Sequence, residues 1–364
     1  MVDVLTKSAL IVHTGGGLGD VLLSGPVIDT LANAGFRVDY LARSSTAHAL
    51  RGHPSLNELL TIDSKDPNNL KEMRSWADTL KQRQYDIVFL LWSTTRWAWT
   101  LYLAGIPKRV GQDSRLMYSF LFTHRVSIRS EKGDETSHWT DILLDYPRKV
   151  GIEALPARLV YQVEAEAKAQ AKNLLKHANF GTQTGPLLGF HSGKGLDLTP
   201  DRWPVDHFST LARALQDSLG ARIVLTGGPN EIELIEHVSR PLTKPYLNLA
   251  GKTNLQVLAA IIQECDAFIC PDSGPMHIAA AVKTPVVGIY ALDEDFPSRW
   301  APFGTPHKII RPTRPACPPG CKKPDCPNFA CYLKVKPDAL SLATSELIGE
   351  VRRDRIQESC EDLT

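Results

Sequence analysis

The chain has 364 residues, and its 41 basic and 40 acidic side chains give a formal net charge of +1. This length exceeds what one ordinary core supports and predicts two domains of roughly 150 to 200 residues each. The balanced charge argues against a general nucleic-acid-binding surface, so we expect no nucleic acid among its partners. The longest apolar stretches have the length of strands, and residues 1–7 lack the pattern of a secretory signal. We therefore expect a cytoplasmic protein.

In the first half of the chain, strand-like runs alternate with helical patterns. The predicted strands are Ser8–His13, Phe36–Leu41, Leu59–Ile62, Tyr85–Leu91 and a short one at Arg109–Gly111. A glycine-rich turn follows the first strand, and apolar residues at helical spacing run from Val21 to Ala32.

The second half begins again after Pro147, Gly151 and Pro156, which mark a boundary. The predicted strands are Leu187–His191, Arg222–Thr226, Ala267–Cys270 and Val286–Tyr290; the predicted helices are Glu164–His177, Val205–Leu219, Asn230–Val238, Asn254–Cys265 and Pro275–Val282. A last helix is expected from Pro337 to about Arg355. This alternation is typical of α/β domains with parallel sheets covered by helices. We expect one Rossmann-like domain at 1–155 and another at 156–336, a cleft between them, and a terminal helix at 337–364 that packs back on the first domain.

The first chemistry-bearing segment is Gly15-Gly16-Gly17-Leu18-Gly19-Asp20, between the first strand and a helix. Glycines let a backbone approach a ligand closely, and a helix N-terminus offers unpaired N–H groups. A carboxylate at Asp20 would repel a pyrophosphate, which disfavours a dinucleotide site. Two interpretations stay open for Asp20: a general base at the edge of a cleft, or a carboxylate that stabilises the start of its helix.

Two strand–turn–helix segments of the second half predict ligand contacts. Thr226-Gly227-Gly228 with Glu231 can place a ribose against backbone, although an ordinary βα turn has the same pattern. In Asp272-Ser273-Gly274-Pro275-Met276-His277, the first-turn N–H groups form an anion site to which His277 can donate. The alternatives are a simple N-cap at Ser273 and a structural histidine.

Lys194 and Arg202 are cations near the start of the second half and suit a diphosphate leaving group. The alternative is a solvated loop in which Trp203 is a packing anchor. Motifs of hydrolases, P-loop kinases and metalloproteases are absent from the sequence, which disfavours those classes.

Four of the seven cysteines, Cys317, Cys321, Cys326 and Cys331, lie within fifteen residues. In a cytosolic protein such a cluster favours metal binding or free thiols over disulfides. Four thiolates can hold Zn²⁺ or iron tetrahedrally in a structural site, and unligated thiols are the alternative.

Taken in order, these segments resemble the glycosyltransferase family of the ADP-heptose:lipopolysaccharide heptosyltransferases, family 9. The resemblance rests on Gly19-Asp20-Val21-Leu22-Leu23 with Pro26, on Arg202-Trp203-Pro204 with Phe208, on Leu225-Thr226-Gly227-Gly228 and on Asp272–Ala280. It extends from about Ala9 to Leu347.

The resemblance implies the GT-B fold and an inverting sugar transfer that needs no catalytic metal. It places the acceptor mainly on the first domain, where Gly17, Gly19, Arg96 and Arg109 are candidate contacts, and makes Asp20 the general base. Arg43, Arg115 and Arg125 outline further possible contacts to an anionic acceptor. The donor, ADP-heptose, would contact Lys194, Arg202, Thr226, Gly227, Glu231 and residues 272–277. The acceptor would be a lipopolysaccharide core or a related glycan, attached to lipid A, so that the enzyme works peripherally at the inner membrane face.

The cysteine cluster resembles a segment found in part of this family, whose protein-modifying members bind iron through four cysteines. A protein-directed heptosyltransferase is therefore one alternative. A GT-B-like nucleotide-sugar epimerase and a non-catalytic nucleotide-binding relative are the others.

Overall fold

The computed structural model describes residues 7–193, 203–291, 296–312 and 330–361. The chain divides into two compact units, Met1–Gln162 and Val163–Thr364. The division falls in the extended segment that follows α6 (Asp145–Arg148), a few residues beyond the boundary we placed after residue 155.

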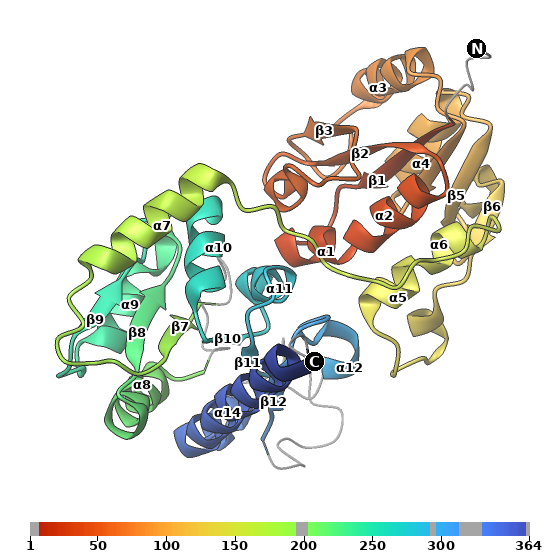
Figure 1. Ribbon diagram of the computed structural model, residues 1–364. Helices are drawn as coiled ribbons and strands as arrows, with labels where there is room; N and C mark the ends of the chain where they lie inside the picture. Colours follow the sequence, from red (N-terminus) through yellow and green to blue (C-terminus); the bar gives the residue numbers. More distant parts are fainter. Residues whose placement is uncertain (1–6, 194–202, 292–295, 313–329, 362–364) are drawn as a thin grey trace. The chain divides into compact units, whose positions relative to one another are not determined.

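The first unit contains a parallel sheet with the strand order β3-β2-β1-β4-β5-β6 (Figure 1). Its strands are β1 (Ser8–His13), β2 (Arg37–Arg43), β3 (Glu58–Ile62), β4 (Ile87–Leu90), β5 (Lys108–Gln112) and β6 (His124–Val126). Its helices are α1 (Leu18–Leu23), α2 (Gly25–Asn33), α3 (Leu70–Gln82), α4 (Thr95–Leu103), α5 (Trp139–Leu143) and α6, with 3-10 turns η1 (Ala47–Leu50), η2 (Ser119–Leu121) and η3 (Arg129–Lys132).

The second unit repeats this plan in the order β12-β11-β10-β7-β8-β9. Its strands are β7 (Leu187–His191), β8 (Arg222–Thr226), β9 (Tyr246–Asn248), β10 (Ala267–Pro271), β11 (Val286–Ile289) and β12 (His307–Ile310). Its helices are α7 (Ala165–His177), α8 (Val205–Leu219), α9 (Ile232–Ser239) after the turn η4 (Pro229–Glu231), α10 (Leu255–Glu264), α11 (Gly274–Ala281), α12 (Pro297–Trp300), α13 (Ala330–Lys334) and α14 (Pro337–Glu361).

Both sheets are doubly wound, and the strand order reverses beside β1 in the first unit and beside β7 in the second. In such sheets ligands bind at the carboxyl ends of the strands, where the order reverses. The glycine turn after β1 and the loops after β7 and β10 lie at these two points. The two α/β domains with parallel sheets that the sequence predicts are confirmed, whereas the short strands β6, β9 and β12 were not predicted.

Each sheet buries both faces, which explains its nearly continuous apolar strands. In the first unit, Leu10 and Val12 of β1 pack with Trp97 and Leu101 of α4. Tyr40, on β2, pairs with Ile11 and has its hydroxyl 2.7 Å from Oγ of Ser24, which lies between α1 and α2. The opposite side of α4 is exposed to solvent, as at Trp99 and Tyr102.

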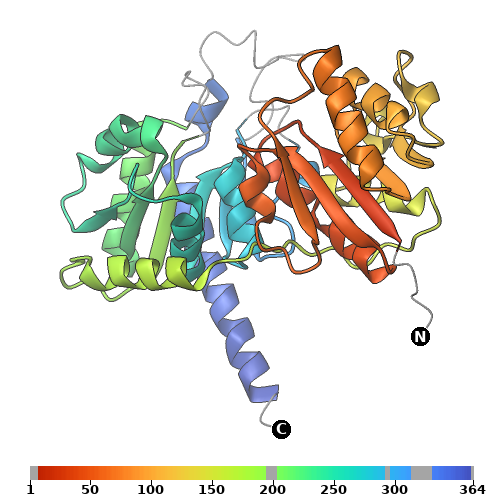
Figure 2. The same cartoon turned by 90° about the horizontal axis from the view of Figure 1, so that it is seen from above.

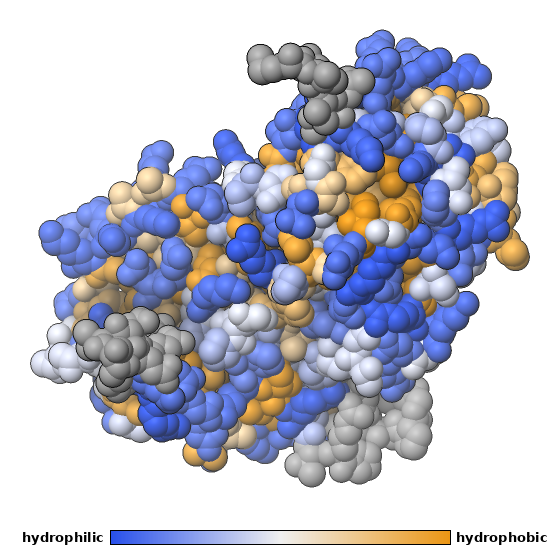
Figure 3. Space-filling view, turned by 45° about the vertical axis from the view of Figure 1, so that its right-hand side comes forward, coloured by the Kyte–Doolittle hydropathy of each residue, from blue (hydrophilic) through white to orange (hydrophobic). Residues whose placement is uncertain are grey.

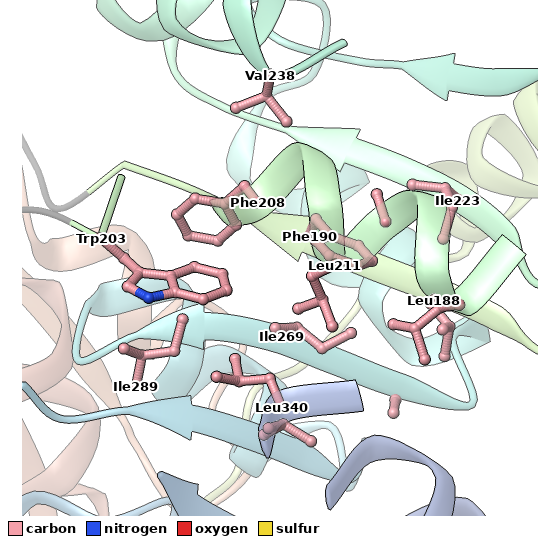
Figure 4. Packing of buried hydrophobic residues seen from close by; sticks show 14 of the residues in the cluster. Leu188, Phe190, Trp203, Phe208, Leu211, Ile223, Val238, Ile269, Ile289 and Leu340 are labelled. Carbon is pink, nitrogen blue, oxygen red and sulfur yellow. The ribbon is translucent and has the colours of Figure 1, made fainter. Parts of the chain in front are cut away.

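The larger cluster of the second unit joins α8, α9 and α14 to one face of the sheet (Figure 4). Trp203 is completely buried there, stacks edge-on against Phe208 and donates its indole N–H to the Val335 carbonyl at 2.8 Å. The packing-anchor interpretation of Trp203 is thus confirmed.

The terminal helix α14 packs against α8 and β12 of the second unit through Leu340, Ala343 and Leu347. It ends later than expected, at Glu361, and its last turns project beyond the sheet (Figure 2). Packing of this helix on the first domain stays a prediction. Among the described helices, none combines the length and apolar character needed to cross a bilayer.

Candidate active site

The turn between β1 and α1 requires its glycines for different reasons. A Cβ on Gly15 would lie 2.0 Å from the indole of Trp92, which follows β4. Gly16 adopts a φ of +65°, and a Cβ there would lie 2.6 Å from the Asp20 carboxylate. The turn therefore has room for Trp92 on one side and for Asp20 on the other only because side chains are missing.

Asp20 lies in the first turn of α1, where its Oδ2 accepts the backbone N–H of Gly17 at 2.6 Å. This bond caps the helix, so the structural interpretation of Asp20 holds for one oxygen. Oδ1 has no such partner among the described residues, and the side chain is partly exposed. Asp20 can therefore cap its helix and still offer one oxygen to a ligand.

A buried histidine lies beneath this turn. His13 ends β1, its ring centroid is 5.7 Å from that of Trp92, and both ring nitrogens are buried without a hydrogen-bond partner in the described structure. Burial lowers the pKa of His13, against the opposing effect of the Asp20 charge. The Arg43 guanidinium donates to the Gly16 carbonyl and so ties the turn to the end of β2.

A cavity of about 300 Å³ opens at the carboxyl ends of β4 and β5. Its walls combine aromatic rings and hydrogen-bonding groups, with Trp92, Gln112, Arg115, Glu131 and Trp139 among them. Glu131 accepts from Gln112 and Arg115, at 2.6 and 2.7 Å, and these contacts hold both donors in place. Aromatic faces beside fixed polar groups suit a sugar, and Trp92 connects this cavity to the glycine turn.

The predicted acceptor contacts separate into two groups. Gly17 and Gly19 belong to the turn and first helical residues beside Asp20, and Arg96 is exposed in the first turn of α4, where it donates to the Pro67 carbonyl at 3.0 Å. Arg109 lies near the amino end of β5, stacks on Tyr102 and donates to the carbonyls of Ile106 and Leu121. Because β5 is parallel to its neighbours, Arg109 lies away from the carboxyl edge where Asp20 is found.

Arg115, in contrast, lines the cavity at that edge. Arg115 was one of five arginines of the first domain that the sequence offered as acceptor contacts, and the sequence does not show which of them the chain brings to this edge.

A second cavity, of about 500 Å³, lies in the second unit at the carboxyl ends of β7, β8 and β10. Six predicted donor contacts line it, namely Gly227, Glu231, Asp272, Ser273, Gly274 and Pro275; further lining residues are His191, Gly228, Pro229, Asn230, Thr253, Asn254, Leu255 and Leu258. The volume is within the range of small-molecule and cofactor sites. The Thr253–Leu258 wall was missed, although Asn254 before an apolar helical run is a recognisable N-cap.

Glu231 is the most constrained polar group of this cavity. Its Oε2 accepts the Gly228 N–H at 2.6 Å, while Oε1 is buried without a hydrogen-bond partner in the described structure. A Cβ on Gly193 would lie only 1.3 Å from Oε1, so a glycine is required there. An unpaired buried carboxylate oxygen is costly, and a ligand hydroxyl would satisfy it.

His191 and Thr226 are the last residues of β7 and β8, and of the two only His191 lines the cavity. Thr226 donates to the Phe190 carbonyl at 2.9 Å and lies 3.4 Å from His191 Nδ1, so it is beneath the cavity and not in its wall. Burial lowers the pKa of His191, opposed by the Glu231 charge. The histidine is therefore neutral near pH 7.

The start of α11 completes the cavity. Ser273 is the N-cap residue, and Pro275 occupies the first turn, where a missing N–H costs no helical bond. The N–H groups of this turn, with the helix dipole, favour an anion. Met276 and His277 are buried and do not line the cavity: Met276 Sδ lies 3.3 Å from the Tyr290 hydroxyl, and His277 Nε2 lies 3.9 Å from Oδ1 of Asp272, which does line it.

Lys194 and Arg202 fall outside the described residues, as do Cys317, Cys321 and Cys326. Their predicted roles stay predictions. Cys331 is described and is 1% exposed within the apolar cluster of the second unit.

The model of glycosyltransferase family 9 (heptosyltransferase) matches residues 73–327. Lipopolysaccharide heptosyltransferase 3 of Escherichia coli (strain K12) is 29% identical over 317 residues, which cover 78% of this chain and 82% of that protein.

Two solved structures share the fold. The family 9 glycosyl transferase from Veillonella parvula DSM 2008 has a TM-score of 0.80 at 21% identity and covers 95% of this chain and 98% of its own. ADP-heptose lipopolysaccharide heptosyltransferase II of E. coli has a TM-score of 0.73 at 22% identity, covering 95% of this chain and 99% of its own. They confirm the expected GT-B fold with two Rossmann-like domains.

A third solved structure shares the fold more distantly. The iron-containing dodecameric glycosyltransferase TibC of enterotoxigenic E. coli H10407 has a TM-score of 0.52 at 14% identity, covering 95% of this chain and 77% of its own. Within the described residues, no group of three or more histidine, cysteine or acidic side chains is placed to hold a metal ion.

Proposed function

The chain belongs to glycosyltransferase family 9, the heptosyltransferases, and on that premise we propose that it transfers a heptose from ADP-heptose to a sugar of the lipopolysaccharide core. The observation that carries the proposal is the cavity of the second unit, in which a buried, half-satisfied carboxylate and a helix N-terminus line the same space. A nucleoside diphosphate carries both complementary groups, ribose hydroxyls and phosphates.

In the proposed donor complex, Glu231 Oε1 accepts a ribose hydroxyl and the N–H groups at the start of α11 hold the diphosphate. Pro229, Leu255 and Leu258 supply an apolar wall for the adenine ring. Lys194 and Arg202 follow β7 in the chain and would add positive charge at the leaving phosphate.

The proposed reaction is a single displacement. The free oxygen of Asp20 takes the proton from the acceptor hydroxyl, the hydroxyl oxygen bonds to the anomeric carbon, and the bond from that carbon to the diphosphate breaks, so that its configuration inverts. Charge develops on the departing ADP, and the α11 N–H groups with the two cations stabilise it. This electrostatic stabilisation would take the place of a catalytic metal.

The acceptor sugar is proposed to occupy the cavity of the first unit. The Trp92 ring forms the wall nearest the glycine turn, and Gln112 and Arg115 are held as donors by Glu131. Arg115 is ion-paired with Glu131, so it offers this site fixed N–H donors for sugar hydroxyls and no net positive charge. Arg109 is left out of the proposed site because of its position on β5.

The cysteine cluster is a separate proposal: Cys317, Cys321, Cys326 and Cys331 would hold one structural zinc or iron ion. Elemental analysis of purified protein is expected to give about one metal ion per chain. A content near zero would end this proposal and leave the proposed transfer reaction untouched.

The transfer reaction is tested with purified protein in two steps. First, ADP-heptose at about 100 times its dissociation constant should stabilise the protein by about 2.7 kcal/mol, or roughly 5 to 11 °C in Tm for a unit of this size. GDP- and UDP-sugars at the same concentration serve as controls. A larger shift with one of these would overturn the donor assignment.

Second, incubation with ADP-heptose and a core oligosaccharide that lacks the terminal heptose should give a product heavier by one heptose residue in mass spectrometry, with release of ADP. ADP-heptose binding without transfer to any core acceptor would contradict the acceptor assignment alone.

A further inference from the structure

An ion pair forms part of the wall of the cavity in the first unit. Glu131, on η3, accepts hydrogen bonds at both carboxylate oxygens: Oε1 from Arg115 at 2.7 Å and from Gln112 at 2.6 Å, and Oε2 from the Ser114 hydroxyl at 2.6 Å. Burial raises the pKa of Glu131, but the hydrogen bonds from Ser114 and Gln112 and the charge of Arg115 outweigh burial and hold this pKa below its ordinary value. Glu131 is therefore an anion near pH 7, and its charge offsets that of Arg115.

The wall of this cavity consequently has no net charge. Among its described lining residues, Arg115 and Glu131 alone are charged, and the others are apolar, aromatic or neutral polar groups. Outside the wall, the exposed Lys65 has its Nζ 5.6 Å from the ring centroid of Trp92, and the Asp20 carboxylate lies beside the glycine turn that Trp92 touches. A ligand in the cavity thus meets one cation in the wall, and that cation is already paired.

The other arginines that the sequence offered for an anionic acceptor do not supply a charge to this wall. Arg43, Arg96 and Arg109 each donate to backbone carbonyls of the chain itself. Arg125 is exposed on β6 and does not line the cavity. The face of the molecule in Figure 3 is largely hydrophilic with apolar groups between, so polar groups are common on its surface. The cavity differs from that surface because its charge is balanced.

We propose that Glu131 determines acceptor specificity: by neutralising Arg115, it restricts the cavity to an uncharged sugar ring and disfavours a ring that carries a phosphate or a carboxylate. This inference rests on the acceptor role proposed above for the cavity, and it narrows the class of acceptor.

The two kinds of sugar differ in what they gain from the wall. An anionic ring loses hydration on entry and meets the repulsion of Glu131 together with the attraction of Arg115, so the attraction does not offset the lost hydration. The hydroxyls of an uncharged ring can accept from Gln112 and Arg115 and donate to Glu131, which replaces their bonds to water. Selection against the wrong ligand then comes from a repulsive group in the site.

The proposal is tested by binding, without donor or transfer, so that its failure is separate from failure of the transfer reaction. The probes are the methyl glycoside of a heptose and the same glycoside with a phosphate on one ring hydroxyl. Each is titrated into the whole protein, and binding is followed by saturation-transfer NMR. Wild-type protein should bind the uncharged glycoside at least about tenfold more tightly than the phosphorylated one.

Three variants change the charge of the wall in a defined way. Glu131→Gln keeps the size of the side chain and leaves Arg115 uncompensated, so the phosphorylated glycoside should gain at least about tenfold in affinity relative to the uncharged one. Arg115→Gln leaves the charge of Glu131 unopposed and should shift the ratio of the two affinities in the opposite direction. The double variant has no net charge in the wall and should return the ratio toward that of the wild type.

Glu58→Gln is the matched control. It breaks an ion pair of similar exposure, in which Glu58 Oε2 lies 2.6 Å from Arg83, at the first residue of β3 and outside the cavity wall. Both glycosides should bind this variant as they bind the wild type. Opposite shifts in the two single variants could not come from a general loss of folded protein, which would weaken both glycosides alike.

An unchanged ratio in Glu131→Gln would refute the proposal, because the cavity would then select by shape and not by charge. Wild-type protein that binds the phosphorylated glycoside as tightly as the uncharged one, or more tightly, would refute it as well. If neither glycoside binds, both the acceptor role of the cavity and this proposal are wrong, while the donor assignment stands on its own test. Transfer of heptose to a core acceptor, combined with the wrong ratio, would leave the proposed reaction intact and overturn the role of Glu131 alone.

Discussion

Asp20 has two roles that a pair of substitutions can separate. Asp20→Asn keeps an oxygen that can accept the Gly17 N–H, but it removes the basic carboxylate. Asp20→Ala removes both. The capping bond should survive in the first variant and be lost in the second.

The magnitudes follow from these contacts. Loss of a general base should reduce kcat by about 10²- to 10⁴-fold, which corresponds to roughly 2.7 to 5.4 kcal/mol of activation free energy. Loss of the negative charge at the helix start should cost about 0.3 to 1 kcal/mol of folding stability, and loss of the cap about 1 kcal/mol more. For a unit of this size, Asp20→Asn should lower Tm by roughly 1 to 4 °C, and Asp20→Ala by up to roughly 8 °C.

The assay is steady-state transfer of heptose with both substrates varied, beside thermal denaturation and calorimetric titration with ADP-heptose. Both variants should lose kcat to a similar extent and keep the donor affinity of the wild type. Asp78→Asn makes the same chemical change at an exposed position of α3 and should leave kcat and Tm unchanged.

The result that would refute the reasoning is a difference in activity between the variants. If Asp20→Asn keeps more than about a tenth of wild-type kcat while Asp20→Ala is inactive, the carboxylate only caps the helix, and another group must take the proton.

Three further predictions test the two cavities and the buried histidines. Glu231→Ala should weaken ADP-heptose binding about 10- to 100-fold in calorimetric titration, because it removes the charged acceptor for a ligand hydroxyl. The control is Glu233→Ala, at an exposed position of α9, and equal affinities of the two variants would contradict the ribose contact. Gly15→Ala should raise KM for the acceptor more than KM for the donor, because the new Cβ must displace Trp92; Gly349→Ala on α14, where a Cβ has room, should change neither constant. Burial lowers the pKa of His13 and of His191, so as pH falls below the ordinary histidine pKa of about 6.5 the unfolded chain takes up protons before the folded one. In urea denaturation, the free energy of unfolding should therefore fall by up to about 1.4 kcal/mol per pH unit for each histidine. A free energy of unfolding that is equal or greater at pH 5 than at pH 7 would show that neither histidine is buried neutral.

Much of the fold follows from the sequence because its signals are local. Apolar runs of strand length alternate with helical patterns, and glycines interrupt the chain where a strand turns into a helix. The capping role of Asp20 is also local, since donor and acceptor are three residues apart. The strand order then gathers the predicted donor segments after β8 and β10 at one edge, as the physics of parallel sheets requires.

The tertiary structure decided which way each side chain points and which residues far apart in the sequence touch. Gly15 must be glycine because Trp92 arrives from the end of β4, and Gly193 must be glycine because Glu231 arrives from the turn after β8. Arg109 and Arg115 are close in sequence, yet β5 carries one near its amino end and delivers the other to the cavity. The sequence alone determined which turns bear the chemistry, because backbone preferences act over a few residues. Which side chains meet in each cavity depended on the packing of segments far apart in the chain, for which no local pattern exists.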